Sequence, residues 1–488
     1  MSATACLKTK PVIQMDARER SLLLNHLTPP GGLYTEGQRS FPQRSHAPWR
    51  VSSEPFWITQ AMLEHIQALG NHLLKFYKAC NLLYSQSLRG IHPTWIAEYL
   101  DRGKPDSVVA FGRMNRFKQH LPGVIRPDLI PTSDGMVATE LDSVPGGIGF
   151  TASLAQRYGE LGYPIVGSPD GLVLGFVDMV RSASSRHDPV LGIVVSEESA
   201  NYRPEMVWLG EELNRIGLRT AVVKPEEVDF AEDGLWVPMN GLPVRIDVLY
   251  RFFELFDLVN VPKSELMLYA AKKGAVLMVP PVKAYLEEKL WMALFHHPVI
   301  EGFWVGELGE ETFDLLKRTF PRTWILDPRP LPPHAAIPGM QVRGYPIASW
   351  ETLRRLTQKE RQLVVKPSGF SEVSWGSRGV SVGHDMSEEA WGQALHLALD
   401  SFENTTFVLQ EFHKGAQFNV DYYDFEGDVV KRLNGRARLC PYYYLVDGQA
   451  RLGGILATIC PPDKKLLHGM VDAVMVPCGV KPEGEMAQ

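Results

Sequence analysis

A βαβ pattern in the middle of the chain places the strongest constraint on its fold. Residues 190–196 form an apolar run of strand length, residues 204–216 repeat apolar side chains at helical spacing up to Gly217, and residues 219–223 form a second apolar run. Two strands joined by one helix and brief connections favour parallel pairing, because a parallel pair needs a crossover connection. A third run, residues 244–251, extends the pattern. We therefore predict an α/β layer with a parallel sheet.

A charged hairpin is predicted ahead of this layer. Side chains alternate along a strand, so Arg126 shares a face with Asp128, and Glu140 shares one with Asp142. If the Thr-Ser-Asp-Gly turn at 132–135 closes a hairpin, the three carboxylates lie side by side next to an arginine. Neighbouring acids repel each other unless a cation offsets their charge, and Mg²⁺ prefers such oxygen ligands. The alternative interpretation is an exposed acidic turn.

Overall composition limits the classes of function. The chain has 488 residues, of which 45% are hydrophobic and 22% charged, which suits a protein with two or three packed units. Its formal net charge of −6 provides no positive field for nucleic acid or anionic lipid, so neither partner is expected. No apolar run has the length of a signal peptide or a membrane span, and a cytoplasmic location is the default expectation.

The cysteines indicate reduced thiols. The five of them are an odd number, spread thinly over a long chain, which argues against a disulfide framework. Cys440, Cys460 and Cys478 flank His468, so a zinc site is conceivable, but no pair has the close spacing of a zinc module. Buried structural cysteines and a structural histidine are the favoured interpretation.

Changes in composition divide the chain. The first 53 residues are rich in Pro, Gly, Ser and Arg, residues 54–87 carry apolar side chains at helical spacing, and residues 328–338 form a Pro-rich linker. We expect further helices in 93–121 and in 283–296. The predicted units are an N-terminal arm (1–53), a helical region (54–121), a metal-binding hairpin and helix (122–185), a Rossmann-like layer (186–275), a helical segment with the linker (276–360), and a nucleotide lid with the C-terminal part (361–488).

The last unit begins with a lysine on a strand. Residues 363–367 form an apolar strand that carries Lys366, and a glycine-rich loop at 370–383 follows it. Backbone amides of such a loop can close over phosphates, while the lysine supplies a point charge. The next strand, 405–411, continues into a polar bend that can contact an adenine edge. No Walker A triplet and no protein-kinase motif is present.

Taken in order, these motifs resemble a known family. The chain is similar to circularly permuted ATP-grasp ligases, in particular to the synthetase domain of glutathionylspermidine synthase and its uncharacterised relatives. The resemblance covers about residues 126–421 and implies a mixed α/β ATP-grasp fold, with a Rossmann-like pre-ATP-grasp layer and an N-terminal helical region. It also implies site residues: metal ligands Asp128, Glu140 and Asp142; ATP contacts Lys289, Lys366, Ser368, Gly376, Arg378, Gly379, Gln410, Glu411 and Phe412; and catalytic arginines Arg126, Arg251 and Arg438.

Two of these arginines also have interpretations from the residues alone. Arg251 ends a strand in Tyr-Arg-Phe-Phe-Glu, where it faces a ligand crevice or forms an ordinary surface pair with an acid. Arg438 and Arg451 lie in the C-terminal part, where an arginine can clamp a phosphoryl group or belong to a solvated basic face. We favour the clamp for Arg438 and the solvated face for Arg451.

The sequence also departs from the family pattern. Asp142 stands where the family has asparagine, and Gly146-Gly147 replaces a segment that helps hold the peptide substrate. These departures argue against glutathione as the substrate. No amidase-like domain with a catalytic cysteine is evident, so a second activity is not expected.

The resemblance implies a reaction. The expected activity is ATP- and Mg²⁺-dependent ligation of a small-molecule carboxylate to an amine through an acylphosphate, with an amino acid, peptide or polyamine as substrate. Two alternatives stay open: a phosphotransferase that acts on a non-carboxylate acceptor, and a nucleotide-binding sensor or scaffold without turnover.

Overall fold

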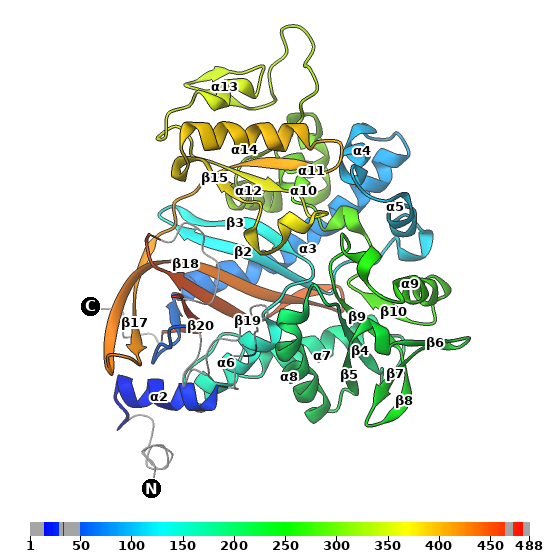
Figure 1. Cartoon of the computed structure of the whole chain (residues 1–488), viewed down its shortest axis with the longest axis vertical. Helices are drawn as coiled ribbons and strands as arrows, with labels where there is room; N and C mark the ends of the chain where they lie inside the picture. The colour runs from blue at the N-terminus through cyan, green and yellow to red at the C-terminus, as the bar shows by residue number, and fades with distance from the viewer. Residues whose placement is uncertain (1–13, 29–32, 34–48, 464–471, 482–488) are drawn as a thin grey trace.

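The computed structural model describes residues 14–28, 33, 49–463 and 472–481, apart from the side chains of 375–377. Most of the predicted arm, Cys6 and His468 lie outside these residues. The described chain is a mixed α/β structure with several sheets, as predicted (Figure 1). The structure contains no helix, among the residues it describes, that has the length and apolar character needed to cross a membrane.

A large sheet occupies the middle of the molecule. Its order is β1-β20-β19-β18-β2-β3, and β17 pairs with the first half of the long strand β18. The second half of β18 pairs with β2 on the same side. The strands are β1 (Phe56–Ile58), β2 (Val124–Thr132), β3 (Gly135–Asp142), β17 (Gln417–Asp424), β18 (Val429–Val446), β19 (Gln449–Cys460) and β20 (Val474–Val480). Residues at the two ends of the chain therefore belong to one sheet with the predicted hairpin.

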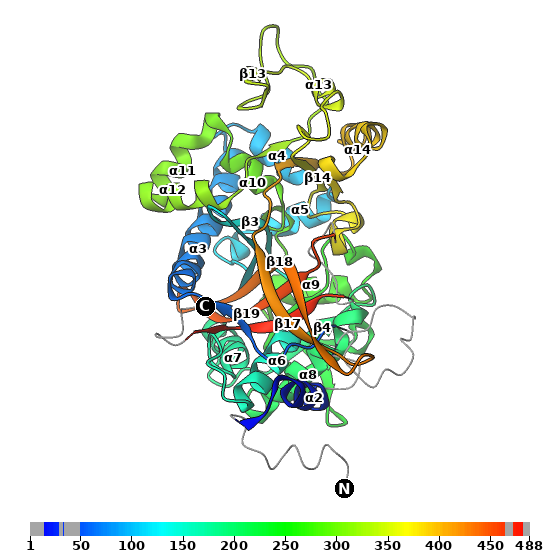
Figure 2. The ribbon, with the colours of Figure 1, turned by 90° about the vertical axis from the view of Figure 1, so that its left-hand side faces the viewer.

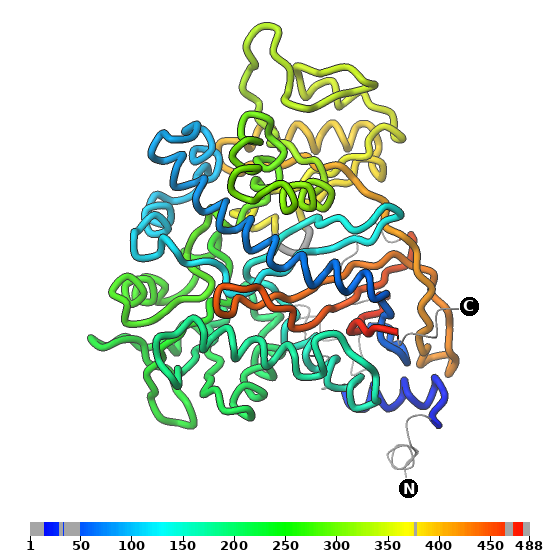
Figure 3. Tube along the Cα trace, turned by 180° about the vertical axis from the view of Figure 1, so that it is seen from behind, coloured from blue at the N-terminus to red at the C-terminus, as the bar shows by residue number. Residues whose placement is uncertain are grey.

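Helices cover both faces of this central sheet. The long helix α3 (Gln60–Leu88) crosses one face (Figure 3), while α6 (Ile148–Glu160) and α7 (Gly171–Ala183) cover the other. The prediction that the long helix begins at residue 54 is wrong. Thr59 caps the helix by accepting a hydrogen bond from the Met62 amide, and the residues before it pair with β20 instead. Sheet pairing overrides the apolar periodicity at this end.

The parallel sheet is present as predicted. Its order is β10-β9-β4-β5, formed by β4 (Leu191–Val195), β5 (Thr220–Val223), β9 (Val248–Phe252) and β10 (Leu277–Val279), and α8 (Arg203–Arg215) joins β4 to β5. The single strand predicted over 244–251 is wrong. It divides at Asp247, whose carboxylate and amide both bond to the backbone of Val190 (3.0 and 2.9 Å). The first part, β8 (Leu242–Ile246), pairs with β7 (Gly234–Met239), which also pairs with β6 (Asp229–Ala231).

A four-stranded antiparallel sheet lies above the central one (Figure 2). Its order is β11-β16-β14-β15, with β11 (Thr323–Ile325), β14 (Leu363–Pro367), β15 (Ser381–Val382) and β16 (Phe407–Glu411), and α14 (Glu388–Asp400) covers it. This unit has its own hydrophobic core around Trp391 and Leu409. A hairpin of β12 (Gln341–Val342) and β13 (Tyr345–Pro346) and the short α13 (Glu351–Arg354) lie beyond it. The Pro-rich residues 328–338 contain no helix or strand.

The helix predicted over 283–296 is interrupted. A 3₁₀ turn (Ala284–Leu286) and α10 (Leu290–Phe295) are separated by residues 287–289, which are not helical. The reason is tertiary: the three charged side chains of this break contact three different parts of the molecule, as described below. The remaining α-helices are α2 (Ala17–Leu27), α4 (Trp95–Asp101), α5 (Asp106–Gly112), α9 (Ser264–Lys273), α11 (Glu301–Leu308) and α12 (Glu310–Thr319).

The described cysteines are buried and free. Cys80 lies in α3, and Cys440, Cys460 and Cys478 lie on strands of the central sheet. Burial raises the pKa of Cys440 to about 12. These four thiols therefore have the character of buried structural residues.

Candidate functional site

The predicted hairpin is formed. β2 and β3 pair antiparallel, with Thr132 opposite Gly135 at the turn and Arg126 opposite Asp142 at the other end. The register shifts between Pro127 and Leu129, where Thr139 and Glu140 on β3 oppose the single residue Asp128 on β2 and form a β-bulge. Asp128 is two residues from Arg126 along β2, so by strand alternation its side chain lies on the face that carries Arg126 and Asp142.

Two arginines hold the acids of the hairpin. Arg126 Nη2 lies 2.9 Å from Asp142 Oδ2 and 3.3 Å from Asp128 Oδ1. Arg438 Nη1, which comes from β18 and is 310 residues away in sequence, lies 3.0 Å from Asp128 Oδ2. The Cys440 thiol donates to Asp128 Oδ1 at 3.4 Å. Arg438 is thus part of this cluster, whereas the side chain of Arg451 is 50% exposed and is not a neighbour of these acids.

Both predicted lysines meet β3. Lys289 Nζ lies 2.9 Å from Glu140 Oε1, and Lys366 Nζ donates to the Thr139 carbonyl (3.0 Å) and to Gln410 Oε1 (2.8 Å). Burial lowers the pKa of Lys366 to about 8. Burial is the largest single effect on the pKa of Glu140 and would raise it, but the charges of Lys289 and Lys366 and the hydrogen bond from Lys289 together hold it below its ordinary value. The two ammonium groups therefore reach neighbouring residues of one strand from two different elements.

Arg251 is not a surface residue. It is fully buried at the end of β9 and donates to the Phe253 carbonyl and to Glu287. Burial raises the pKa of Glu287 to about 7. The pKa of the partly exposed Glu254 is raised well above its ordinary value, first by burial and then by the neighbouring charge of Glu287. Acids and a cation therefore gather at the carboxyl end of the parallel sheet, where α/β proteins commonly bind ligands.

The break at residues 287–289 joins these groups. Glu287 pairs with Arg251, Glu288 with Lys104 near the start of α5, and Lys289 with Glu140 on β3. Among these three residues, the family resemblance implies a role for Lys289 alone. For Glu287 and Glu288, the available signal was their position in a run of three charged residues that interrupts an apolar helical pattern.

The residues of the glycine-rich loop and of the strand end before it lie in different surroundings. Ser368 is buried and its hydroxyl has no hydrogen-bond partner among the described residues, whereas Arg378 is 61% exposed and pairs with Glu198 at 3.6 Å. A Cβ at Gly379 would lie 2.8 Å from the ring of Pro367, so the loop packs tightly there. Gly376 lies in the 3₁₀ turn Glu372–Ser377. The structure thus places Ser368 near the lysine but directs Arg378 toward the parallel-sheet layer.

The predicted adenine-contacting strand is β16 and its continuation. The Gln410 side chain contacts Lys366, but the amides of Glu411 and Phe412 donate to the carbonyls of Arg322 (2.8 Å) and Gln362 (3.0 Å). Among the described residues, the next backbone amides, 413–415, have no backbone acceptor. These three residues belong to the polar bend after strand 405–411 that the sequence indicated as a contact for an adenine edge. A cavity of about 490 Å³ adjoins this bend and is lined by residues that include Trp324, Met340, Leu356, Phe412 and His413.

The donor set suits Mg²⁺ in its chemistry. Carboxylate oxygens are the ligands that Mg²⁺ prefers, and it commonly takes only one or two of them. Each acid of the hairpin is held by an arginine or lysine, and in the part of the chain that the structure describes no three acidic, His or Cys side chains are grouped to hold a metal ion. The three acids nevertheless lie close together, because Asp128 acts to raise the pKa of both Glu140 and Asp142, and Glu140 acts to raise that of Asp142. The residues therefore fit Mg²⁺ that takes one or two ligands from these carboxylates and its remaining ligands from phosphate oxygens and water.

Comparisons with known proteins support the fold. No protein-family model and no curated protein matches the sequence. A glutathione synthetase-like effector from Globodera pallida matches over 99% of this chain and 100% of its own, with a TM-score of 0.55 and 10% identity. A proposed gamma-glutamylcysteine synthetase from Methylobacillus flagellatus KT covers 87% of this chain and 89% of its own at 12% identity, but its TM-score of 0.40 carries no argument. The chain therefore shares the fold of a glutathione synthetase-like protein.

Proposed function

We propose that this protein is an ATP- and Mg²⁺-dependent carboxylate–amine ligase of the ATP-grasp type. The observation that carries the proposal is that Lys289 and Lys366, from two separate elements, both meet the strand that carries Glu140 and Asp142. A phosphate chain bound there would have cations on one side and metal-binding acids on the other. The likeness in fold to a glutathione synthetase-like protein supports the same reaction class.

Each charged group has a proposed role. The side chains of Lys289 and Lys366 bind the ATP phosphates, and Asp128, Glu140 and Asp142 hold the metal. The adenine lies against the bend after β16, where Gln410 fixes Lys366 and the free amides of 413–415 face the base. Ser368, Gly376 and Gly379 belong to the loop that covers the phosphates, and Arg378 reaches them only if it leaves Glu198.

The substrate carboxylate is bound by arginines in this scheme. Arg126 and Arg438 share Asp128, and Arg251 lies at the adjoining end of the parallel sheet. Guanidinium groups hold carboxylates and phosphoryl groups by paired hydrogen bonds, and they stabilise the charge that develops during transfer. The partly exposed Glu254 lies close to Glu287 and Asp142, and a substrate ammonium group bound beside it would favour its ionised form and pair with it.

The reaction needs no side-chain nucleophile. A carboxylate oxygen of the substrate attacks the γ-phosphorus, the bond to ADP breaks, and an acylphosphate forms. The amine then attacks the acyl carbon, inorganic phosphate leaves, and the amine loses a proton to give an amide. Bound Mg²⁺ would neutralise phosphate oxygens. The protein supplies position and charge.

The ion pairs of the free protein imply an exchange of partners. If Lys289 moves from Glu140 to a phosphate oxygen when ATP binds, the exchange frees Glu140 as a metal ligand at the same time. Phosphate and metal would therefore enter together, each taking one member of the pair. This exchange would account for the arrangement of Asp128, Glu140 and Asp142, which lie close together but, among the described residues, are not arranged around a metal position in the free protein.

The test uses purified protein and ATP labelled with ¹⁸O at the β,γ-bridge. With Mg²⁺ and a pool of carboxylates alone, formation of an acylphosphate scrambles the label without net turnover. Addition of amino acids, peptides or polyamines should then release phosphate. Formation of ADP together with a phosphorylated hydroxyl compound, without free phosphate, would support a phosphotransferase. ATP binding with neither scrambling nor phosphate release would overturn the ligase.

A further inference from the structure

One buried ion pair connects parts of the chain that the proposed reaction does not use. Lys104 Nζ contacts Glu288 Oε1, and the two side chains are 1% and 0% exposed. The other oxygen of Glu288 accepts the amide of Gly369 at 3.2 Å. Gly369 is the first glycine after the Lys366 strand, at the entrance to the loop that covers the phosphates in the proposed function. A charge of the helical region is thereby linked to the backbone of that loop.

The contact at Gly369 is close. A Cβ there would lie 1.6 Å from the Glu287 carbonyl oxygen, so glycine alone lets the loop backbone approach the break at 287–289. Lys104 also lies 5.6 Å from the centre of the Phe370 ring and donates to the Leu100 carbonyl at 2.6 Å. The two loop residues 369 and 370 thus both adjoin this ion pair.

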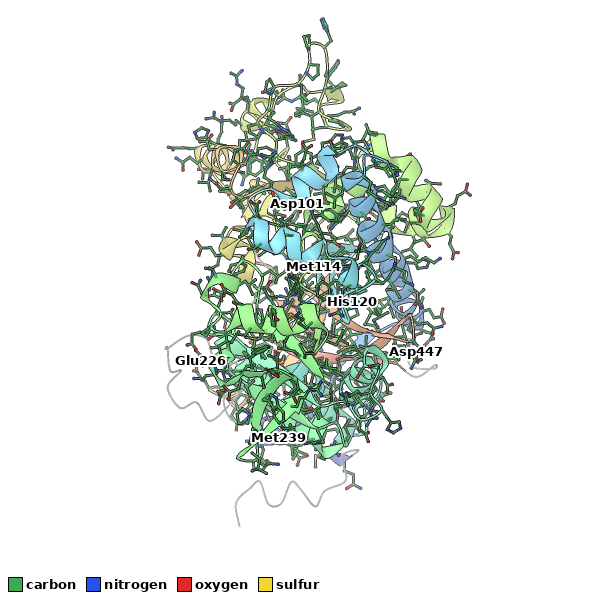
Figure 4. The ribbon with its side chains drawn as sticks, turned by 90° about the vertical axis from the view of Figure 1, so that its right-hand side faces the viewer. Asp101, Met114, His120, Glu226, Met239 and Asp447 are labelled. Carbon is green, nitrogen blue, oxygen red and sulfur yellow. The ribbon has the colours of Figure 1, made fainter. Side chains whose placement is uncertain are left out.

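The turn that carries Lys104 is docked on the nucleotide-lid unit as well. Arg102 pairs with Glu403 at 2.5 Å, and a Cβ at Gly103 would meet the Asn404 carbonyl at 2.1 Å. Figure 4 shows the molecule from the right-hand side of Figure 1. Asp101 and Met114 lie near the middle of this view, between the lid unit above and the parallel-sheet layer below. The turn at 101–104 therefore contacts the lid and the base of its loop at once.

We propose that Lys104 and Glu288 are positioning residues that hold the base of the phosphate-covering loop through the Gly369 amide. The expected effect on ATP affinity rests on the proposed function. The contact that fixes the base of the loop does not depend on it. Glu288 accepts the Gly369 amide best as a carboxylate, and Lys104 keeps that carboxylate charged within a buried site. With the loop base fixed, ATP binding does not have to order it, and affinity is gained by preorganisation.

A purely structural role is the competing explanation, since a buried pair that loses one partner leaves an uncompensated charge. Two double variants separate the explanations. Both K104M/E288Q and K104M/E288M remove both charges with side chains of similar size, but only the glutamine variant offers a side-chain oxygen to the Gly369 amide. Both should fold with similar melting temperatures.

Two measurements compare the double variants. Deuterium exchange of residues 368–374 in the free protein should be faster in K104M/E288M, and its calorimetric dissociation constant for MgATP should be about three- to tenfold weaker, as expected for one lost hydrogen bond. Equal exchange and equal affinity in the two variants would overturn the positioning role. The exchange measurement needs no ligand, so it still decides the inference if the wild-type protein fails to bind ATP and the proposed function is wrong.

Discussion

At the scale of single residues, the candidate site is defined by which cation holds which acid. Asp128 lies between Arg126 and Arg438, Asp142 is bound by Arg126, and Glu140 is bound by Lys289. Opposite charges in contact lower the cost of burying each group. A ligand with phosphate groups and a divalent cation carries the same two signs and can replace these pairs one for one.

Replacing Lys366 with methionine should weaken ATP binding. The ammonium is buried and hydrogen-bonded to Gln410 and the Thr139 carbonyl, so a phosphate contact there is shielded from water. We expect a loss of about 2–4 kcal/mol in ATP binding, measured by calorimetric titration, with the fold retained. Lys359→Met, at an exposed position shortly before β14, is the matched control and should bind like wild type. Equal affinity of the Lys366 variant would remove this residue from the site.

Substitutions at Asp142 test the metal ligand that departs from the family pattern. Asp142 Oδ1 accepts the Val144 amide at 2.9 Å, and Oδ2 faces Arg126. Asparagine can keep the first bond and still offer an oxygen, so Asp142→Asn should retain substantial activity at millimolar Mg²⁺. Asp142→Ala removes both contacts and should raise the Mg²⁺ requirement strongly.

The Asp142 measurement is a Mg²⁺ titration of phosphate release for wild type and both variants. Glu140→Gln should behave like the alanine variant, because it removes charge next to Lys289. If Asp142→Ala titrates like wild type, the hairpin is only an acidic turn at that residue.

At the scale of elements, consecutive tyrosines of β18 fix the helices on the two faces of the central sheet. A Cβ at Gly70 of α3 would lie 2.5 Å from the Tyr443 ring, and a Cβ at Gly175 of α7 would lie 2.3 Å from the Tyr444 ring. Neighbouring strand residues point to opposite faces, so each ring fits against one helix. Tyr443 also donates to the Ile66 carbonyl at 2.5 Å. The glycines permit close packing of both helices.

Replacement of Gly70 by alanine should therefore destabilise the protein, although alanine favours helices. The clash with Tyr443 should cost about 1–3 kcal/mol, more than the gain of up to about 1 kcal/mol from helix propensity. Gly306→Ala in α11, where a Cβ meets no atom within 4 Å, should show the propensity gain alone. Urea unfolding of the three proteins measures the difference. A Gly70 variant as stable as the Gly306 variant would contradict the packing argument.

Local patterns predicted the elements that depend on neighbouring residues. The turn at 132–135 and the βαβ unit follow from residue type and periodicity, and both are present. The division at Asp247 and the break at 287–289 depend on partners distant in sequence, so periodicity continued through them. The position of Arg438 next to Asp128 depends on the pairing of β18 with β2. For Arg378, family resemblance predicts a phosphate contact, and this stays a prediction; in this structure its guanidinium lies 3.6 Å from Glu198.

At the scale of the whole molecule, the helical region and the sheets are joined by buried polar contacts as well as by a common core. Lys283, just before the 3₁₀ turn, donates to Asn81 of α3 (2.8 Å) and to the carbonyls of Lys118 (3.1 Å) and His120 (2.8 Å). Tyr285 donates to the same Asn81 oxygen at 2.8 Å. The lysine is 1% exposed and has no acidic partner among the described residues. One lysine therefore connects three segments without a salt bridge.

This lysine should make stability depend on pH. Burial lowers the pKa of Lys283 to about 7 from its ordinary 10.5, so between these values the unfolded chain binds the proton that the folded protein releases. Stability from this group therefore rises with pH, by at most about 1.4 kcal/mol per pH unit. Lys283→Met cannot release a proton, so the stability of wild type minus that of the variant should grow between pH 7 and 9 in urea unfolding. The exposed Lys359→Met variant should show no such trend. A difference that stays flat or shrinks would mean that the ammonium is charged in the folded protein and is stabilised by its three acceptors.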